Sequence, residues 1–215
     1  MGYFVKAFDS LISSLFHARF YAGLERTWDL SWMGVTCLKN PLDMWMYQEL
    51  LHRNRPDVLV ECGTNEGGSA LFFAHMFDLI GHGRVISIDV KARQGKPEHP
   101  RIEYLVMSST SLECVQALTR RIQLSEAVMA VLDSDHSREH VRKELEVYAP
   151  MVTTGQYLVV EDTNINGHPV KKSFGPGPME AVMDFLQTNR DFEIDRRQER
   201  LKITFSPSGW LKRVA

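Results

Sequence analysis

Acidic side chains follow two apolar runs in the C-terminal half of the chain. Asp133 comes directly after residues 127–132, and Glu161 and Asp162 come directly after residues 157–160. If these runs are neighbouring parallel strands, their carboxyl ends bring all three carboxylates to one space. Carboxylate oxygens suit Mg²⁺ better than zinc, and without a cation the three groups would repel one another. We therefore predict a magnesium site; alternatively, Asp133 caps a helix and the other two point apart.

A histidine lies beside this acidic group. His136 follows Asp133 by three residues, and an imidazole can accept a proton near neutral pH. We predict that His136 is the catalytic base that removes a proton from a hydroxyl held at the metal. The alternative is a solvent-facing histidine at a helix N-terminus. His140 falls on a helical stretch, where we expect a surface or packing role.

A glycine-rich turn follows the first apolar run and reads Glu61-Cys62-Gly63-Thr64-Asn65-Glu66-Gly67-Gly68-Ser69. Glycines allow a sharp turn and a close approach of a ligand to the backbone, but the spacing is not G-x-G-x-x-G. Glu61 precedes the turn and Glu66 lies within it, so a pyrophosphate would be repelled and a sulfonium or ammonium group attracted. These features favour S-adenosylmethionine as the ligand; a purely structural turn is the alternative.

The next two apolar runs also end in polar residues. Asp89 ends the second run, and its carboxylate could accept hydrogen bonds from both hydroxyls of an adenosine ribose. Ser108, Ser109, Thr110 and Ser111 follow the third run and could contact an adenine edge. Each of these residues alone would equally fit a solvated loop or a helix cap. Their placement on three consecutive strand ends is what favours a bound S-adenosylmethionine.

The elements that must position these residues alternate along the chain. Five mostly continuous apolar runs predict buried parallel strands, at residues 58–60, 85–88, 102–106, 127–132 and 157–160. Helical patterns lie at residues 69–80, 112–122, 137–148 and 178–188. Gly81 stands where a helix C-cap belongs, and Pro178 suits a first helical turn. Strand–helix alternation of this kind predicts a doubly wound α/β sheet.

The two ends of the chain differ from this pattern. Residues 192–195 and 201–205 alternate apolar with polar side chains, which predicts a C-terminal antiparallel hairpin and a mostly parallel sheet of seven strands. Asn40 and Pro41 form an N-cap and N1 pair for a helix through about residue 52. We interpret residues 1–35 as a helical extension, packed on the core or on another subunit, and residues 36–215 as the main domain.

Composition limits the class of protein. The 215 residues carry a formal net charge of −2 without a basic half, so we expect no nucleic-acid partner. Cys37, Cys62 and Cys114 are scattered and fit neither a disulfide framework nor a metal knuckle, which favours a reducing compartment. No apolar stretch approaches the ~20 residues that span a bilayer, and Asp9 interrupts any secretion signal. We expect a cytoplasmic protein and a homo-oligomer.

Several motifs together resemble the cephalosporin hydroxylase family, whose members are class I S-adenosylmethionine-dependent methyltransferases despite the family name. The motifs lie at residues 39–43, 60–69, 132–137, 161–163, 175–178 and 206–213, and the resemblance covers about residues 35–213. The family includes enzymes linked to cephamycin methoxylation and to rhamnosyl O-methylation of glycolipids. The resemblance implies a Rossmann-like fold and methylation of a hydroxyl on a small molecule, sugar or glycolipid.

A more distant resemblance to catechol O-methyltransferase implies residue roles. Glu61, Gly63 and Ser69 would hold the methionine end of S-adenosylmethionine, Asp89 the ribose and Ser109 the adenine side, and Asp133, Glu161 and Asp162 the magnesium ion. This chain departs from the catechol enzymes in two respects. They have aspartate and asparagine where Glu161 and Asp162 stand, so this site is one charge more negative. They have a lysine base where His136 stands.

Two other functions remain open from the sequence. A non-haem iron oxygenase needs two histidines and a carboxylate on one face, and His136 has no well-placed companion histidine. A non-catalytic subunit would bind S-adenosylmethionine without turning it over. Formation of S-adenosylhomocysteine distinguishes an O-methyltransferase from both.

Overall fold

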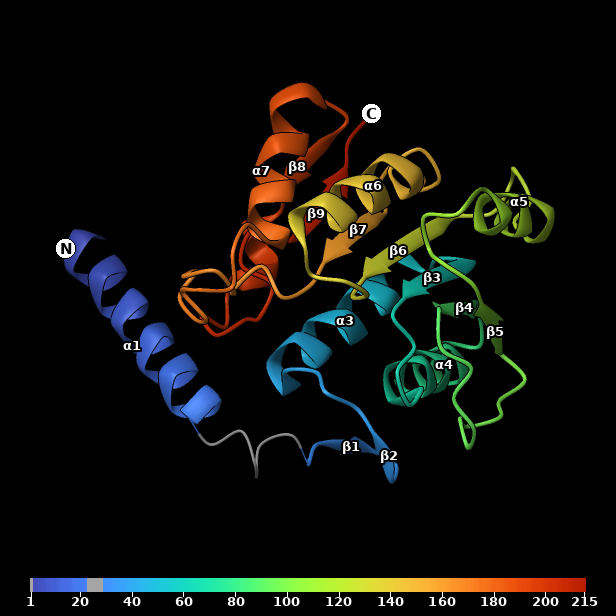
Figure 1. Cartoon of the computed structure of the whole chain (residues 1–215), viewed down its shortest axis with the longest axis horizontal. Coiled ribbons are helices and arrows are strands. Elements are labelled where there is room, and N and C mark those ends of the chain that lie inside the picture. The colour runs from blue at the N-terminus through green and yellow to red at the C-terminus, as the bar shows by residue number, and fades with distance from the viewer. Residues whose placement is uncertain (1, 23–28) are drawn as a thin grey trace.

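The computed structural model describes residues 2–22 and 29–215. Residues 1 and 23–28, which include Trp28 of the predicted extension, lie outside the described part. Seven strands form the main sheet: β3 (Val58–Cys62), β4 (Arg84–Asp89), β5 (Ile102–Val106), β6 (Val128–Leu132), β7 (Tyr157–Val160), β8 (Phe192–Ile194) and β9 (Trp210–Arg213). Their order across the sheet is β5-β4-β3-β6-β7-β9-β8 (Figure 1).

The sheet is mostly parallel. Strands β3 to β7 pair in parallel, and β9 runs antiparallel to both of its neighbours, β7 and β8. The order reverses at β3, since the chain moves from β3 outward to β5 and then returns to β6 on the other side. This arrangement confirms the doubly wound α/β class, the seven strands and the antiparallel C-terminal hairpin.

One strand of the predicted hairpin is wrong. The partner of β8 is β9 at residues 210–213, and the segment 201–205 forms no strand. The backbone of this segment is directed elsewhere, because the Phe205 amide donates to Asp43 Oδ2 at 2.8 Å. A short 3₁₀ helix, η1 (Arg196–Glu199), precedes it. Residues 201–205 therefore do not join the sheet. The buried Trp210 supplies the apolar face of the last strand.

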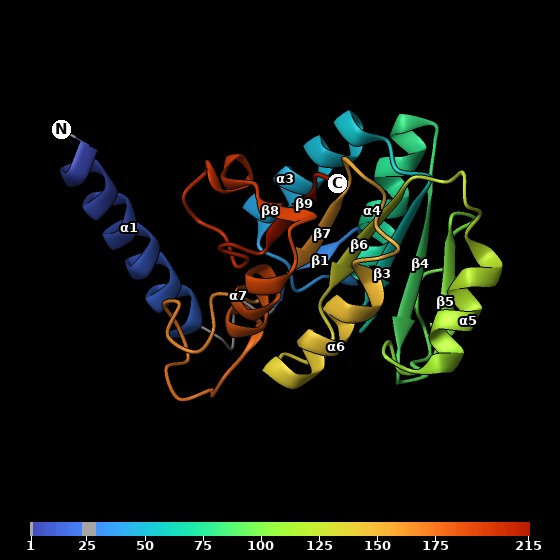
Figure 2. The same ribbon diagram turned by 90° about the horizontal axis from the view of Figure 1, so that it is seen from above.

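Helices cover both faces of the sheet (Figures 1 and 2). One face packs against α3 (Pro41–Asn54) and α4 (Gly68–Ile80), and the other against α5 (Leu112–Arg121), α6 (Arg138–Tyr148) and α7 (Pro178–Thr188). Side chains alternate between the faces along a strand: Val58 and Val60 join the α5–α7 side, whereas Leu59 joins the α3–α4 side. All five helices occur where the sequence predicts them, to within two residues.

Local signals also fix where these helices begin and end. The Asn40 side chain accepts from the Leu42 amide at 3.1 Å, and Pro41 occupies the first helical position of α3. Gly81 closes α4 with φ at 71°, a left-handed conformation that favours glycine. An N-cap such as the Asn40 side chain stabilises a helix by about 1 kcal/mol. The start of α3 matters for the site because Lys39 directly precedes the cap.

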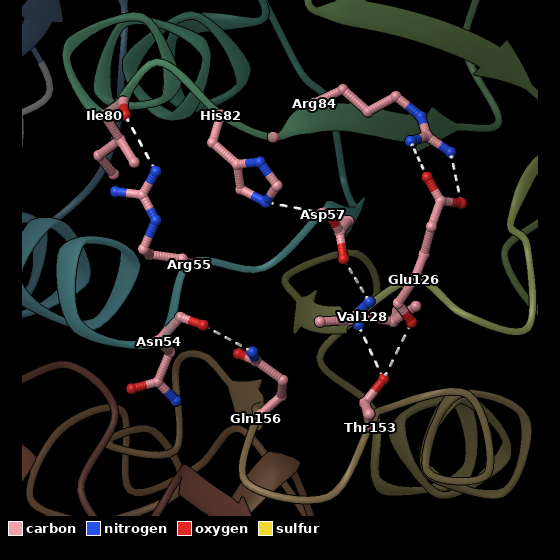
Figure 3. Close-up of polar contacts among 12 residues, drawn as sticks. Asn54, Arg55, Asp57, Ile80, His82, Arg84, Glu126, Val128, Thr153 and Gln156 are labelled. Carbon is pink, nitrogen blue, oxygen red and sulfur yellow. Dashed lines mark hydrogen bonds and ion pairs between the residues drawn. The ribbon is translucent and has the colours of Figure 1, made fainter.

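Polar contacts tie the amino ends of the strands together (Figure 3). The Asp57 carboxylate accepts from the Ala127 amide at 2.7 Å, and Arg84 pairs with Glu126 beside it. Thr153 Oγ1 accepts from the Val128 amide at 2.9 Å. These bonds hold together the edge of the sheet opposite the carboxyl ends of its parallel strands.

The N-terminal segment is a long helix, α1 (Gly2–Ala22), that projects from the body with its N-terminal end farthest out (Figures 1 and 2). Its other end packs on the sheet domain: His17 Nε2 lies 3.1 Å from the Thr204 carbonyl oxygen, and Phe20 packs edge-on against Phe205. A small hairpin of β1 (Ser31–Trp32) and β2 (Val35–Thr36) follows. Within the described residues, no helix is both long and apolar enough to cross a membrane.

Candidate functional site

A cavity of about 570 Å³ opens at the carboxyl ends of β3 to β7. It lies where the strand order reverses, which is where doubly wound sheets bind ligands. Seven residues that the sequence predicts for the site line it: Gly63, Asp89, Ser109, Asp133, His136, Glu161 and Asp162. Two others, Glu61 and Ser69, lie behind its wall.

Gly63 is required for the two central strands to approach each other. Its φ is +102°, and a Cβ there would lie 1.9 Å from the Asp133 carbonyl oxygen. The Gly63 amide donates to the Ile88 carbonyl at 2.8 Å, and the Asp133 amide donates to the Cys62 carbonyl at 2.8 Å. The glycine therefore brings the turn after β3 against the first acidic residue of the site.

Glu61 holds the glycine turn from behind. It is fully buried in β3, where Ser69 Oγ donates to Oε1 at 2.5 Å and Ser87 Oγ donates to Oε2 at 2.6 Å. Burial raises the pKa of this carboxyl to about 7. Because both oxygens are engaged, Glu61 fixes the first turn of α4. Glu66 forms an ion pair with Arg93, so its charge is already compensated.

Asp89 closes the turn after β4. Its Oδ2 accepts from the Asn65 amide and its Oδ1 from the Lys91 amide, each at 2.9 Å. Each carboxylate oxygen has a second lone pair, so Asp89 can still accept from a ligand hydroxyl. The residue thus joins the glycine turn to the loop after β4 and faces the cavity.

Ser109 stands over a buried acid that the sequence does not reveal. Its Oγ donates to Glu144 Oε1 at 2.6 Å, and His140 Nε2 lies 3.2 Å from the same hydroxyl. Glu144 is fully buried, and its Oε2 has no hydrogen-bond partner in the described part of the chain. His140 also lines the cavity, where its ring packs beside Ser109 and Glu144. Hydrogen bonding to Glu144 raises the pKa of the His140 imidazole, although burial opposes this shift.

The predicted base meets two carboxylates at the other end of the cavity. One ligand atom from each of Asp133, His136 and Asp162 lies within 4.8 Å of the others, a grouping that could hold a metal ion. His136 Nε2 is 3.3 Å from Asp162 Oδ2. Burial raises the pKa of the Asp162 carboxyl, and the electrostatic interaction with the neighbouring His136 opposes the shift. Asp162 lies just after the end of β7 and has φ at +53°, a backbone conformation that is uncommon for a residue other than glycine. This conformation sets the direction of its side chain.

Glu161 points toward α3 and is held there by two donors. Its Oε1 accepts from Tyr47 Oη at 2.6 Å and lies 2.8 Å from the Lys39 ammonium. Lys39 Nζ also lies 2.5 Å from Asp133 Oδ2. Burial by itself would lower the pKa of Lys39, but Asp133 and Glu161 outweigh it and hold the value well above its usual range. Lys39 is only 5% exposed, so its charge is committed to these partners.

Sequence reasoning assigned no role to Lys39 or Tyr47. Lys39 meets Asp133 across 94 residues, and Tyr47 meets Glu161 across 114 residues. No local pattern connects residues so far apart. The one local signal is that Lys39 directly precedes the helix N-cap at Asn40. A charged residue that is buried at the start of a helix needs a partner of opposite charge.

Aromatic side chains form the cavity wall beyond the metal-type group. Phe20 and Tyr21 from α1 and Phe205 from the loop before β9 line it, with the Tyr21 and Phe205 ring centroids 5.8 Å apart. Asn164 Nδ2 donates to Tyr21 Oη at 3.2 Å. Lys171 also lines this end and lies 5.6 Å from the Tyr21 ring centroid. The cavity therefore combines an acidic end with an apolar wall.

Comparison with known proteins finds relatives over nearly the whole chain. The model of the family "Rhamnosyl O-methyltransferase/CmcI" matches residues 25–214. A rhamnosyl O-methyltransferase of Mycobacterium leprae is 37% identical over 209 residues, which are 94% of this chain and 90% of the relative. Two solved structures, an apo CmcI-N160 and a CmcI-D160 with Mg and SAM, are each 21% identical over 88% of this chain and 78% of theirs. Their TM-scores of 0.66 and 0.64 show the same fold.

Proposed function

Since this chain belongs to the rhamnosyl O-methyltransferase/CmcI family, we propose that it transfers the methyl group of S-adenosylmethionine to a rhamnosyl hydroxyl beside a magnesium ion. The observation that carries the proposal is the convergence of Asp133, His136 and Asp162 within 4.8 Å in one cavity with the glycine turn. The rhamnosyl acceptor rests on the name of the M. leprae relative. The same cavity thus offers a place for the donor, a metal and the acceptor.

The glycine-turn end of the cavity fits S-adenosylmethionine. Asp89 retains lone pairs for the ribose hydroxyls, and Ser109 and His140 offer polar atoms for an adenine edge. Gly63 has no side chain, so the methionine portion could approach the backbone closely at this point of the cavity wall. Glu61 and Ser69 contribute from behind this wall by fixing the turn. The role of these two residues is therefore positional.

The acidic end fits a hard divalent cation. The Asp133 and Asp162 carboxylates lie close enough to share one ion, with His136 beside them, and Glu161 lines the same cavity. Both described donors to Glu161 bind its Oε1, which leaves Oε2 as a further oxygen ligand. When bound, Mg²⁺ would stabilise negative charge on the acceptor oxygen.

His136 is the proposed base. Its imidazole faces Asp162 at 3.3 Å, and a carboxylate partner fixes the orientation of the ring. A hydroxyl is a weak nucleophile until its proton leaves, so His136 takes that proton. Methyl transfer is an in-line displacement, and holding the reacting oxygen ~3 Å from the methyl carbon supplies much of the acceleration.

The aromatic wall suits the acceptor. Tyr21 and Phe205 line the cavity next to the acidic end, and rhamnose has an apolar side that carries its C6 methyl group. Stacking of an apolar sugar face on these rings would leave the sugar hydroxyls directed at His136 and the metal. Position and chemistry of the wall therefore match a deoxyhexose.

Incubation with S-adenosylmethionine, MgCl₂ and 4-nitrophenyl α-L-rhamnoside tests the proposal. We expect S-adenosylhomocysteine and a rhamnoside heavier by one methylene group, both lost on chelation with EDTA. Catechol serves as the comparison acceptor and should react far more slowly. Binding of S-adenosylmethionine without release of S-adenosylhomocysteine from any rhamnoside would favour a non-catalytic subunit. Product formation that needs oxygen and 2-oxoglutarate would favour an oxygenase.

A further inference from the structure

Lys39 is a buried cation placed between the two central strands of the site. Its ammonium lies 2.5 Å from Asp133 Oδ2 after β6 and 2.8 Å from Glu161 Oε1 after β7. The residue is 5% exposed and directly precedes the N-cap of α3, where Asn40 and Pro41 fix the backbone. The ammonium is therefore held in one place by both its backbone and its partners.

The charges at this site balance only when Lys39 is counted. Asp133, Glu161 and Asp162 carry three negative charges, one more than a divalent cation can neutralise. The Lys39 ammonium supplies the remaining positive charge from within the protein. Burying an unbalanced carboxylate is costly, so a fixed cation at this point stabilises the folded chain before any metal binds.

Lys39 also decides which carboxylate oxygens face the cavity. It engages Oδ2 of Asp133 and, together with Tyr47, Oε1 of Glu161. The second oxygen of each carboxylate is left for another ligand. Two cations that share the same carboxylates repel each other, and this repulsion is strong where water is largely excluded.

We propose that Lys39 is a positioning residue that competes with the divalent cation for Asp133 and Glu161, and thereby orients both carboxylates and limits the affinity for the metal. The inference rests on the proposed metal site and adds a role for a residue that contacts two of its ligands. Competition between Lys39 and the metal has a consequence that a purely structural lysine would not produce. Removing the charge should tighten metal binding while it slows methyl transfer, because the metal can then settle between carboxylates that are no longer oriented.

The test measures metal binding to the full chain without S-adenosylmethionine or acceptor. Lys39→Met removes the charge at similar length, and Lys39→Arg keeps it. Mn²⁺ titration followed by electron paramagnetic resonance should show at least tenfold tighter binding by K39M and a change below threefold for K39R. In EDTA, K39M should melt below the wild type, and MgCl₂ should raise its Tm by more than it raises that of the wild type. At saturating MgCl₂, kcat of K39M should fall at least tenfold.

Two results would contradict the proposed role of Lys39. Unchanged or weaker Mn²⁺ binding by K39M that melts cooperatively would overturn it, as would equal effects of Mg²⁺ on the two Tm values. If K39M does not fold, Lys39→Gln retains a hydrogen-bond donor without the charge, and the same tightening is expected of it. Failure of the wild type to bind Mn²⁺ at all would instead refute the proposed metal site. Tighter binding by K39M with no rhamnoside methylation by the wild type would support Lys39 and refute only the acceptor.

Discussion

Replacement of Gly63 by alanine should cost both activity and stability. The added Cβ would lie 1.9 Å from the Asp133 carbonyl oxygen and 2.6 Å from its carbonyl carbon. An ordinary carbon–oxygen contact needs roughly 3.4 Å, so the turn after β3 and the end of β6 must separate by about 1.5 Å. This movement displaces Asp133, which belongs to the metal-type group and contacts Lys39.

The size of the effect follows from this displacement. Misplacement of a reacting group by ~1 Å can lower a rate by ~10²-fold, so we expect kcat of Gly63→Ala to fall at least that far. The φ of +102° adds backbone strain of about 1–3 kcal/mol for any residue with a side chain. In a chain of this size, 1 kcal/mol corresponds to a Tm change of about 2–4 °C.

A matched control separates the clash from the strain. Gly155 has φ at +88°, but a Cβ there would meet nothing within 4 Å. It lies at the amino end of β7, away from the cavity. Gly155→Ala should therefore lower Tm through backbone strain alone and leave kcat unchanged. Release of S-adenosylhomocysteine and thermal unfolding, measured for both variants and the wild type, provide the comparison.

If the two alanine variants behave alike, the clash at Gly63 does not control the reaction. Gly63→Ala with a kcat within threefold of the wild type would show that the strand ends adjust without moving Asp133. Equal losses of kcat in both variants would show that general destabilisation, and not the clash at the site, slows the reaction. A Gly63→Ala protein that melts cooperatively and binds Mn²⁺ more weakly would locate the damage at the acidic end.

Three further predictions concern single side chains. His136→Ala should lower kcat by ~10²–10⁴-fold if His136 is the base, with the Kd for S-adenosylmethionine changed less than threefold by calorimetry; a loss below tenfold excludes this role. Asp89→Ala should weaken S-adenosylmethionine binding at least tenfold without altering Mn²⁺ binding, and unchanged affinity would remove Asp89 from the donor site. Burial alone would raise the pKa of the Asp195 carboxyl, but hydrogen bonds from Arg197 and Tyr157 hold it well below its usual value. The ionised Asp195 therefore stabilises the folded chain above about pH 4, and this stabilisation is lost as the pH falls further. Asp195→Asn should therefore show a smaller fall in Tm between pH 5 and pH 2 than the wild type, and parallel Tm curves would contradict this.

The sequence predicts most of the fold because the relevant signals are local. Continuous apolar runs mark β3 to β7, and the Asn40–Pro41 pair and Gly81 mark helix ends within one or two turns of the residues they affect. The hairpin error shows the limit of such signals. Residues 201–205 alternate like a strand, yet Asp43 captures the Phe205 amide from 162 positions away, and the strand forms at Trp210 instead.

The functional site divides in the same way. Acidic residues after β6 and β7 and a glycine turn after β3 can be predicted from the sequence, because parallel strands place their carboxyl ends at one edge. Which atoms meet at that edge cannot be predicted. The sequence groups Glu161 with Asp133 and Asp162 as equals, whereas the tertiary structure ties Glu161 Oε1 to Lys39 and Tyr47.

By itself, the sequence determined the class of fold, the family and the edge of the sheet that carries the chemistry, because each depends on short patterns or on ordered motifs. The tertiary structure decided the partner of each charge. It set Glu61 behind the wall, Glu144 beneath Ser109 and Lys39 between two carboxylates. These pairings join residues brought together only by the packing of helices on the sheet, and a buried charge takes whatever partner that packing provides.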